Sequence, residues 1–305
     1  MRTSRVLRSI MRVGFIGIGL MGLPLCHRLL QAGVDLWIWN RSPAKADSLV
    51  AAGAHLAASP AELAAQVNVL LLCVSDSAAV AEIMRADHGV FAGAHAGLIV
   101  VDHSSITAEL TRELAHELHQ RCDATWVDAP VSGGVIGAEQ GRLVIMAGGD
   151  TTAIAHITPV LSHYAQRITR MGDVGAGQVT KICNQLIVAA NSLLIAETVA
   201  LAEQAGVDAS LLAPALAGGF ADSLPFQILT PRMAERRFQP VQWKVQTLLK
   251  DLGNAVALGH TVASPLPLAT AAQQLMQQHA EHGFGQADLS SIVLLHAPSS
   301  AREQE

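Results

Sequence analysis

The first half of the chain alternates short apolar runs with longer amphipathic stretches. Stretches with helical character lie at 21–32, 43–52, 77–85 and 107–121. Six runs rich in Val, Ile, Leu or Trp predict strands at 12–16, 35–39, 68–74, 97–102, 125–130 and 142–147. Several are apolar at consecutive positions, which is typical of strands that helices cover on both faces. Strand and helix in alternation predict a parallel, doubly wound sheet.

The second half contains no run that predicts a strand after about residue 170. Residues 178–205 contain neither Pro nor Gly and predict one helix, whose 28 residues would extend about 42 Å. Gly206 fits its C-cap, and Asp208 fits the N-cap of the next helix. We therefore expect a Rossmann-type α/β domain at 12–174 and an all-α domain at 175–305, joined by the long helix, with a disordered extension at 1–11.

Composition narrows the class of protein. Half of the residues are hydrophobic and 15% are charged, which favours a compact globular enzyme or binding protein over a disordered chain. The net charge is −5 and basic residues form no long run beyond a few N-terminal arginines, so no nucleic-acid partner is expected. Polar residues interrupt the apolar stretch 178–205, and a membrane span is not expected.

The cysteines argue for a reducing compartment. They lie far apart, form no CxxC pair and follow no secretory leader: Cys26, Cys73, Cys122 and Cys183. A disulfide framework or a structural zinc site is therefore not expected, and a cytoplasmic location fits.

A glycine-rich loop follows the first predicted strand and leads directly into a helix. Its sequence is Gly17-Ile-Gly19-Leu20-Met21-Gly22. In this context the first Gly allows a tight turn, the second lets a phosphate approach the backbone, and the third allows close helix packing. The loop predicts a dinucleotide pyrophosphate site, with a purely structural turn as the alternative.

The end of the second predicted strand bears on the choice of cofactor. The segment Trp39-Asn40-Arg41-Ser42 lacks the acid that an NAD site usually presents to the ribose. Arg41 has the charge to bind a 2′-phosphate, and Asn40 and Ser42 would be neutral supporting donors. We expect NADP to be preferred, with NAD as the alternative; Arg41 as a merely solvated charge stays open.

The search for a catalytic acid leads to lysine. The chain has four lysines against sixteen arginines, and the pattern Tyr-x-x-x-Lys is unavailable because residue 168, four after the single tyrosine, is Ile. Lys181, Asn184 and Gln185 stand at i, i+3 and i+4 on the long helix and share one face. That face could orient a substrate oxygen; a charge with amides that only hydrogen-bond is the alternative.

The chain resembles the β-hydroxyacid dehydrogenase family. Four motifs match in order and spacing over residues 12–295: Val13-Gly-Phe-Ile-Gly-Ile-Gly-Leu-Met-Gly22, Asp128-Ala-Pro-Val-Ser-Gly-Gly134, Gly175-Ala-Gly-Gln-Val-Thr-Lys-Ile-Cys-Asn184 and Lys250-Asp-Leu252. The resemblance implies an NAD(P)-dependent enzyme that needs no metal.

The resemblance also implies roles for individual residues. Lys181 matches the catalytic lysine, and Asn184 matches an amide that holds the substrate. The substrate carboxylate is expected at Ser132, Gly133 and Gly134. Further cofactor contacts are expected at Val74, Ser75, Ser105 and Lys250, although the family often has Pro at the position of Ser75.

Within the family, Gln185 after Asn184 favours a reductase of 2-hydroxy-3-oxopropionate over a 3-hydroxyisobutyrate dehydrogenase or another semialdehyde reductase. An imine reductase is a rival, against which Lys181 and Ser132 count. A non-catalytic nucleotide-binding module is another, against which Lys181 counts. The apolar long helix and the Ala-rich C-terminal helices predict a homodimer or homotetramer through the helical domain.

Overall fold

The computed structural model describes residues 11–296. The chain divides into two compact units between Lys181 and Ile182; we call them the first domain and the helical domain. This division falls inside a helix, whereas the sequence places it at residue 174, ahead of the helix. The predicted N-terminal extension, apart from Met11, lies outside the described residues.

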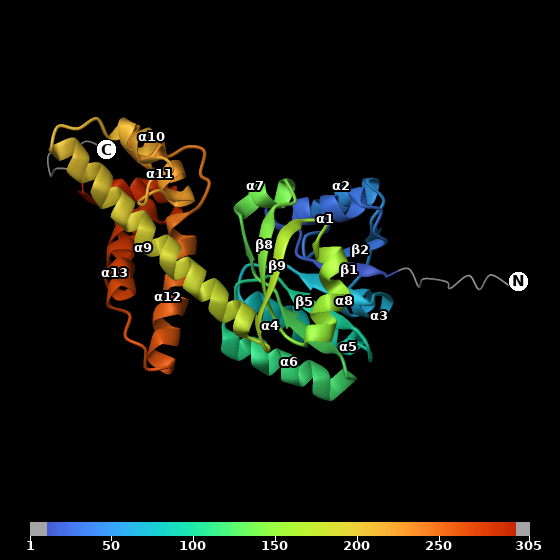
Figure 1. Ribbon diagram of the computed structural model, residues 1–305. Coiled ribbons are helices and arrows are strands. Elements are labelled where there is room, and N and C mark those ends of the chain that lie inside the picture. The colour runs from blue at the N-terminus through green and yellow to red at the C-terminus, as the bar shows by residue number, and fades with distance from the viewer. Residues whose placement is uncertain (1–10, 297–305) are drawn as a thin grey trace, which may run out of the picture. The chain divides into compact units, whose positions relative to one another are not determined.

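The first domain is built on one nine-stranded sheet with the order β3-β2-β1-β4-β5-β6-β8-β7, in which β9 also pairs with β8 (Figure 1). The strands from β3 to β6 in this order are all parallel. The doubly wound Rossmann-type fold is thereby confirmed. The strands are β1 (Val13–Ile16), β2 (Leu36–Trp39), β3 (His55–Leu56), β4 (Val69–Leu72), β5 (Ile99–Asp102), β6 (Thr125–Asp128), β7 (Val131–Ser132), β8 (Leu143–Gly148) and β9 (Ala165–Gly172).

The far end of the sheet departs from the parallel arrangement that the sequence predicts. Both β6 and β7 pair with β8 in antiparallel register, while β8 and β9 are parallel. Three strands had no apolar run to reveal them. The strands β3 and β7 have two residues each, and β9 is an edge strand whose side chains are mostly exposed.

Helices cover both faces of this sheet with separate apolar cores. One core includes Leu25 of α1, Leu49 of α2, Ala138 of α7 and Ile157 of α8. The other includes residues of α3 to α6, such as Leu63 and Leu114. The helices are α1 (Gly22–Gln31), α2 (Asp47–Ala51), α3 (Pro60–Gln66), α4 (Ser77–Arg85), α5 (Val90–Gly93), α6 (Ala108–Cys122), α7 (Gly134–Glu139) and α8 (Thr151–Leu161).

The helical domain contains no strand among the residues described, 182–296, which confirms the all-α prediction. Its core gathers Ala196, Met233, Leu252, Met276 and Ile292. The predicted long helix is observed with slightly shifted ends. The helices are α9 (Ala176–Gln204), α10 (Leu212–Leu216), α11 (Leu224–Ala234), α12 (Val245–Thr261) and α13 (Pro267–Glu281).

Helix α9 is long and apolar enough to pass the length and composition test for a membrane span. About 44% of its most apolar window is buried against the rest of the chain. Core helices of soluble proteins pass the same test, so α9 alone is weak evidence for a membrane.

Candidate active site

The predicted phosphate loop lies where β1 meets α1, and its first and third glycines are required by close contacts. Gly17 has φ +102°, and a Cβ there would lie 2.2 Å from the carbonyl oxygen of Cys73 at the end of β4. A Cβ at Gly22 would lie 2.0 Å from the carbonyl oxygen of Gly17. The loop thus packs between the carboxyl ends of β1 and β4, the usual place for a ligand in a doubly wound sheet.

The middle of the loop is open. A Cβ built at Gly19 meets nothing within 4 Å, and Leu20 is 85% exposed. Helix α1 begins at Gly22 without a side chain that caps its N-terminus. Unfilled space beside uncapped backbone N–H groups suits an anionic phosphate, so the residues fit a dinucleotide cofactor.

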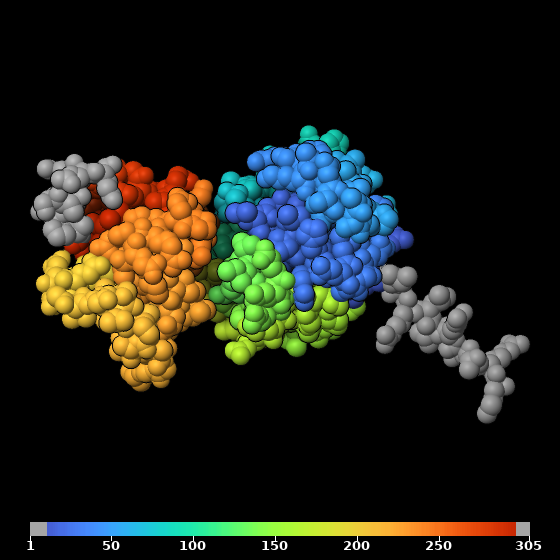
Figure 2. Space-filling view, turned by 90° about the horizontal axis from the view of Figure 1, so that it is seen from above, coloured from blue at the N-terminus to red at the C-terminus, as the bar shows by residue number. Residues whose placement is uncertain are grey.

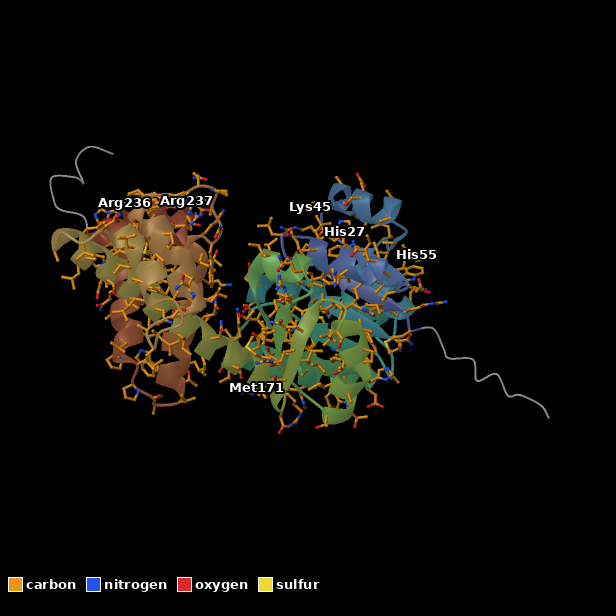
Figure 3. The ribbon with its side chains drawn as sticks, turned by 45° about the horizontal axis from the view of Figure 1, so that its top comes forward. His27, Lys45, His55, Met171, Arg236 and Arg237 are labelled. Atoms are coloured by element: carbon orange, nitrogen blue, oxygen red, sulfur yellow. The ribbon has the colours of Figure 1, made fainter. Side chains whose placement is uncertain are left out.

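Asn40 braces the loop. Its Oδ1 accepts a hydrogen bond from the Ile18 N–H at 2.9 Å, and its Nδ2 donates to the carbonyl oxygen of Ser42 at 2.9 Å. Arg41 and Ser42 are both exposed, and Arg41 makes no ion pair with any residue from 11 to 296. Lys45, exposed on the same segment, lies at the surface in Figure 3.

The loops after β4 and β5 are joined to each other. The Val74 N–H donates to the Ser104 hydroxyl at 3.0 Å, and the Ser104 N–H donates to Asp102 Oδ1 at 2.9 Å. Ser75 donates to the Asp76 carboxylate, which also caps α4. Ser105 is half-buried in the second of these loops. The predicted contacts Val74, Ser75 and Ser105 therefore lie in two adjacent loops at the carboxyl ends of β4 and β5.

Two ionisable groups are buried at the carboxyl end of β5, next to these loops. Burial raises the pKa of Asp102 to about 7, against opposing hydrogen bonds from Ser104, and the second oxygen of this carboxyl has no partner among residues 11–296. Burial lowers the pKa of His103 to about 4. His103 Nδ1 lies 2.6 Å from the carbonyl oxygen of Ala129, which can only accept, so this nitrogen carries the hydrogen. His103 Nε2 then accepts from the Tyr164 hydroxyl at 2.8 Å.

The predicted carboxylate turn follows the short strand β7 and leads into α7. Ser132 is half-buried and pairs with Val144 of β8. Gly133 and Gly134 have φ +130° and +63°, which favour glycine, and Gly134 has open space where a Cβ would be. Figure 2 shows the α7 segment, bright green, at the surface, where Ile136 is 61% exposed. A turn of this shape can offer backbone N–H groups to a carboxylate.

Helix α9 begins against the end of β6. Asp128 Oδ1 accepts from the Gly175 N–H at 2.7 Å, and its Oδ2 accepts from the Gln178 N–H at 2.9 Å. Lys181 follows one turn after Gln178 and is half-buried. The sequence motifs contained Asp128 and Gln178, but sequence reasoning gave neither residue a role.

The predicted site residues of the helical domain form a chain of side-chain contacts. Asn184 Nδ2 donates to Gln185 Oε1 at 2.8 Å, and Gln185 Nε2 donates to Asp251 Oδ2 at 2.5 Å. The other oxygen of Asp251 lies 3.5 Å from Lys250 Nζ. Asp251 joins Asn184 to Lys250, a link that only the Lys250-Asp-Leu252 motif hinted at.

Among residues 11–296 no group of three or more His, Cys, Asp or Glu side chains could hold a metal ion. The predicted site residues offer a lysine, amides, hydroxyls and backbone N–H groups. In the first domain these groups lie along the carboxyl ends of the parallel strands, together with the phosphate loop.

Comparison with known families assigns both parts of the chain. Residues 12–172 match the family model described as the NAD binding domain of 6-phosphogluconate dehydrogenase. Residues 175–296 match the one described as NAD-binding of NADP-dependent 3-hydroxyisobutyrate dehydrogenase. The chain is 34% identical over 283 residues to the 2-hydroxy-3-oxopropionate reductase of Escherichia coli (strain K12), covering 93% of this chain and 96% of that protein.

Further relatives agree. A probable mitochondrial 3-hydroxyisobutyrate dehydrogenase-like protein of Arabidopsis thaliana is 34% identical over 283 residues, 92% of each chain. The solved structure of Mycobacterium tuberculosis 3-hydroxyisobutyrate dehydrogenase with L-serine superposes with a TM-score of 0.84 at 27% identity, over 93% of this chain and 98% of that one. An imine reductase from Pseudomonas sp. has a TM-score of 0.61 at 22% identity, which shows a shared fold alone. A dinucleotide-type loop, a helical second domain and these relatives lead to one conclusion: the chain belongs to the β-hydroxyacid dehydrogenase family and is an NAD(P)-dependent hydroxyacid dehydrogenase.

Proposed function

We propose that the protein reduces a small carboxylated semialdehyde with NADPH, that 2-hydroxy-3-oxopropionate is its preferred substrate, and that Lys181 is the general acid. The observation that carries the proposal is a half-buried lysine on α9, a helix whose first turn is hydrogen-bonded to Asp128 at the carboxyl end of β6. The E. coli relative named as a 2-hydroxy-3-oxopropionate reductase supports the substrate.

In this mechanism the nicotinamide supplies a hydride to the aldehyde carbon. Lys181 donates a proton from Nζ to the oxygen that becomes the hydroxyl group, and it accepts that proton in the oxidative direction. Ser132, Gly133 and Gly134 bind the carboxylate through the turn before α7, and Asn184 holds the substrate hydroxyl. One aldehyde, one hydride and one proton give one alcohol, so no other reactant is needed.

The experiment for the substrate is a kinetic screen. NADPH consumption is measured with 2-hydroxy-3-oxopropionate, methylmalonate semialdehyde, succinic semialdehyde, glyoxylate and a cyclic imine, and NADP reduction is measured with 3-hydroxyisobutyrate and L-serine. The highest kcat/KM is expected for 2-hydroxy-3-oxopropionate. A higher value for the imine would contradict the semialdehyde proposal, and binding without turnover across the panel would indicate a non-catalytic module.

3-Hydroxyisobutyrate is the second candidate substrate. The Arabidopsis relative with that name has the same 34% identity as the E. coli reductase. The oxidative arm of the same screen decides between them.

The NADPH preference rests on Arg41, which is exposed and has no ion-pair partner in the described part of the chain. A charge-assisted hydrogen bond to a phosphate contributes about 1.5–3 kcal/mol. We expect Arg41→Ala to raise the KM for NADPH by about 10- to 100-fold and to leave the KM for NADH within about twofold, because only NADPH carries the 2′-phosphate. An equal change in the KM for both cofactors in steady-state assays would show that Arg41 does not bind the 2′-phosphate.

We also propose that the protein is a homodimer or homotetramer through the helical domain, in the cytoplasm. Three exposed apolar residues follow one side of α9 at a spacing of seven: Ile187, Leu194 and Leu201, exposed by 62%, 61% and 70%. We expect Leu194→Glu to yield monomers in sedimentation experiments, with Val50→Glu, at an exposed apolar residue of the first domain, as a matched control. The four cysteines are free thiols, which supports a reducing compartment.

A further inference from the structure

We infer that Asp128 and Gln178 are positioning residues that set where α9 carries Lys181 relative to the loop that carries Ser105. The inference rests on the proposed function, because it takes Lys181 as the general acid. Neither side chain needs to touch the substrate or cofactor. Both act through hydrogen bonds to backbone atoms.

Asp128 holds the start of α9. The residue is fully buried at the end of β6, and each carboxylate oxygen accepts one N–H, from Gly175 and from Gln178. The first N–H groups of a helix have no partner inside the helix, and a negative charge there also suits the helix dipole. One side chain of the sheet therefore meets both needs at the N-terminus of the helix that carries Lys181.

The space around this carboxylate leaves little freedom. A Cβ at Gly148 would lie 2.6 Å from Asp128 Oδ1, and a Cβ at Gly177 would lie 2.4 Å from the carbonyl oxygen of Met146. Both positions therefore require glycine. The first turn of α9 packs backbone against backbone on the sheet, which leaves no room there for a residue larger than glycine.

Gln178 ties the same turn to the loop after β5. Its side chain is buried, Nε2 donates to the carbonyl oxygen of Ser104 at 2.8 Å, and Oε1 accepts from the Ile106 N–H at 3.3 Å. These two backbone groups flank Ser105. Gln178 and Lys181 stand at i and i+3 on the helix, so they lie on the same side of it.

Losing the Gln178 side chain removes the tie between α9 and the loop after β5, so the spacing between Lys181 and that loop is no longer fixed. Ser104 keeps its bonds to Asp102 Oδ1 and to the Val74 N–H, so the loop retains two other anchors. A displacement of about 1 Å in a catalytic group costs up to about 100-fold in rate. The inference therefore predicts a loss in kcat with little change in cofactor affinity.

The test compares Gln178→Met, which keeps length but removes both hydrogen bonds, with Thr180→Val as a matched control. The Thr180 hydroxyl donates only to the Ala176 carbonyl within α9. The readouts are kcat and KM for 2-hydroxy-3-oxopropionate, NADPH Kd by fluorescence without substrate, and the melting temperature. We expect Gln178→Met to lower kcat about 10- to 100-fold with NADPH Kd within about threefold, and the control to stay within about twofold throughout.

A double-mutant cycle with Lys181→Ala separates positioning from a general loss of structure. If Gln178 acts through Lys181, adding Gln178→Met to Lys181→Ala should change the residual rate by less than about twofold. Multiplicative effects, or wild-type kcat in Gln178→Met, would overturn the inference. If Gln178→Met does not fold, Gln178→Asn, a neutral amide that is too short to keep both hydrogen bonds, takes its place with the same expectations.

Asp128→Asn is an independent second variant, because its amide nitrogen must face one of the two N–H groups of α9. It should lower kcat at least as much as Gln178→Met and should show the same masking by Lys181→Ala; additivity there would count against Asp128. Failure of the proposed function looks different. Lys181→Ala with near wild-type turnover overturns both, whereas an inactive Lys181→Ala beside a fully active Gln178→Met overturns only the positioning role.

Discussion

The pKa values of buried carboxyl groups shift in opposite directions in the two domains. At the sheet edge of the first domain, burial raises the pKa of Asp102 to about 7 and raises the pKa of Asp128 as well. In the helical domain, Asp288 is also buried and burial again raises its pKa. There, hydrogen bonds from the Ser290 hydroxyl and from backbone N–H groups outweigh that effect, and the net pKa is lowered.

The partners explain the difference. Asp288 lies 3.1 Å from Arg232 and accepts further bonds from Gln242 and Ser290. Asp102 accepts hydrogen bonds from Ser104 alone among the described residues, and one of its oxygens has no partner there. Buried ionisable groups with strongly shifted pKa values are common at functional sites, whereas groups with hydrogen-bond and ion-pair partners are typical of structural interiors. The comparison therefore finds a carboxyl group that is costly to ionise at the carboxyl end of β5, and a well-paired structural carboxylate in the helical domain.

The strongest test removes the proposed acid. We expect Lys181→Ala to lower kcat by about 10² to 10⁴, the usual loss when a general acid is deleted. NADPH affinity should change little, because the phosphate loop and Arg41 are untouched. Steady-state kinetics and NADPH binding give both numbers. Turnover within about twofold of wild type would remove Lys181 from the mechanism and leave the first domain without its proposed chemistry.

The buried ion pair of the helical domain should matter for stability and not for chemistry. We expect Asp288→Asn to lower the free energy of unfolding by about 3–5 kcal/mol, because Arg232 would stay buried without its counter-ion. The kcat of the folded fraction should be unchanged. Urea denaturation and kinetics at low temperature measure the two effects. A large loss of kcat with normal stability would contradict the division of roles.

Acid pH should affect the stability of the two domains to different extents. Burial lowers the pKa of both His103 and His279 to about 4 from an ordinary value of 6.5. Between pH 4 and 6.5 the unfolded chain therefore binds more protons at each histidine, so the stabilisation is complete above pH 6.5 and is lost as pH falls toward 4. Each histidine accounts for up to about 3 kcal/mol.

In the first domain Asp102 opposes this loss. Its pKa rises from 3.8 to about 7, so the folded state binds the extra proton and its stability increases as pH falls through that window. The helical domain has no such compensation from Asp288, whose lowered pKa makes it lose further stability below about pH 4. Lowering the pH from 7.5 to 4.5 should therefore destabilise the helical domain by about 2–3 kcal/mol, whereas the stability of the first domain should stay unchanged or rise by up to about 1 kcal/mol.

Hydrogen exchange read by mass spectrometry on the whole protein resolves the two domains. Peptides from α11 and α13 should lose protection at pH 4.5 before peptides from β4 and β5, after correction for intrinsic exchange rates. In Asp102→Asn the larger part of this compensation is gone, and β4 and β5 should become more acid-sensitive than in the wild type. Equal loss in both domains of the wild type would show that the histidines and Asp102 do not set the pH dependence.

Much of the fold was predictable because it depends on local pattern. The apolar runs at β1, β4 and β5 mark strands covered on both faces, and a stretch without Pro or Gly marks α9. The strand β9 was missed because its residues are mostly polar and exposed. The antiparallel pairing of β7 with β8 was missed because two residues carry no periodicity.

The site divides in the same way. The phosphate loop was recognisable because its strand, glycines and helix are adjacent in sequence, and close contacts at Gly17 and Gly22 confirm the need for glycine there. Asn40 shows the limit of such reasoning. Its position predicts a cofactor contact, and nothing in the sequence indicated that its side chain also bonds to Ile18 and Ser42 and braces the loop.

The sequence alone established the kinds of residue available: a glycine-rich loop after a strand, an arginine without an acid beside it in the sequence, and a scarce lysine on a long helix. The bonds of Asp128 and Gln178 emerged only in three dimensions. They join residues 47 to 74 positions apart, and such pairs meet only when strand order and helix placement bring them together. Local propensity acts over a few residues, whereas burial and hydrogen bonding across the sheet depend on the whole chain.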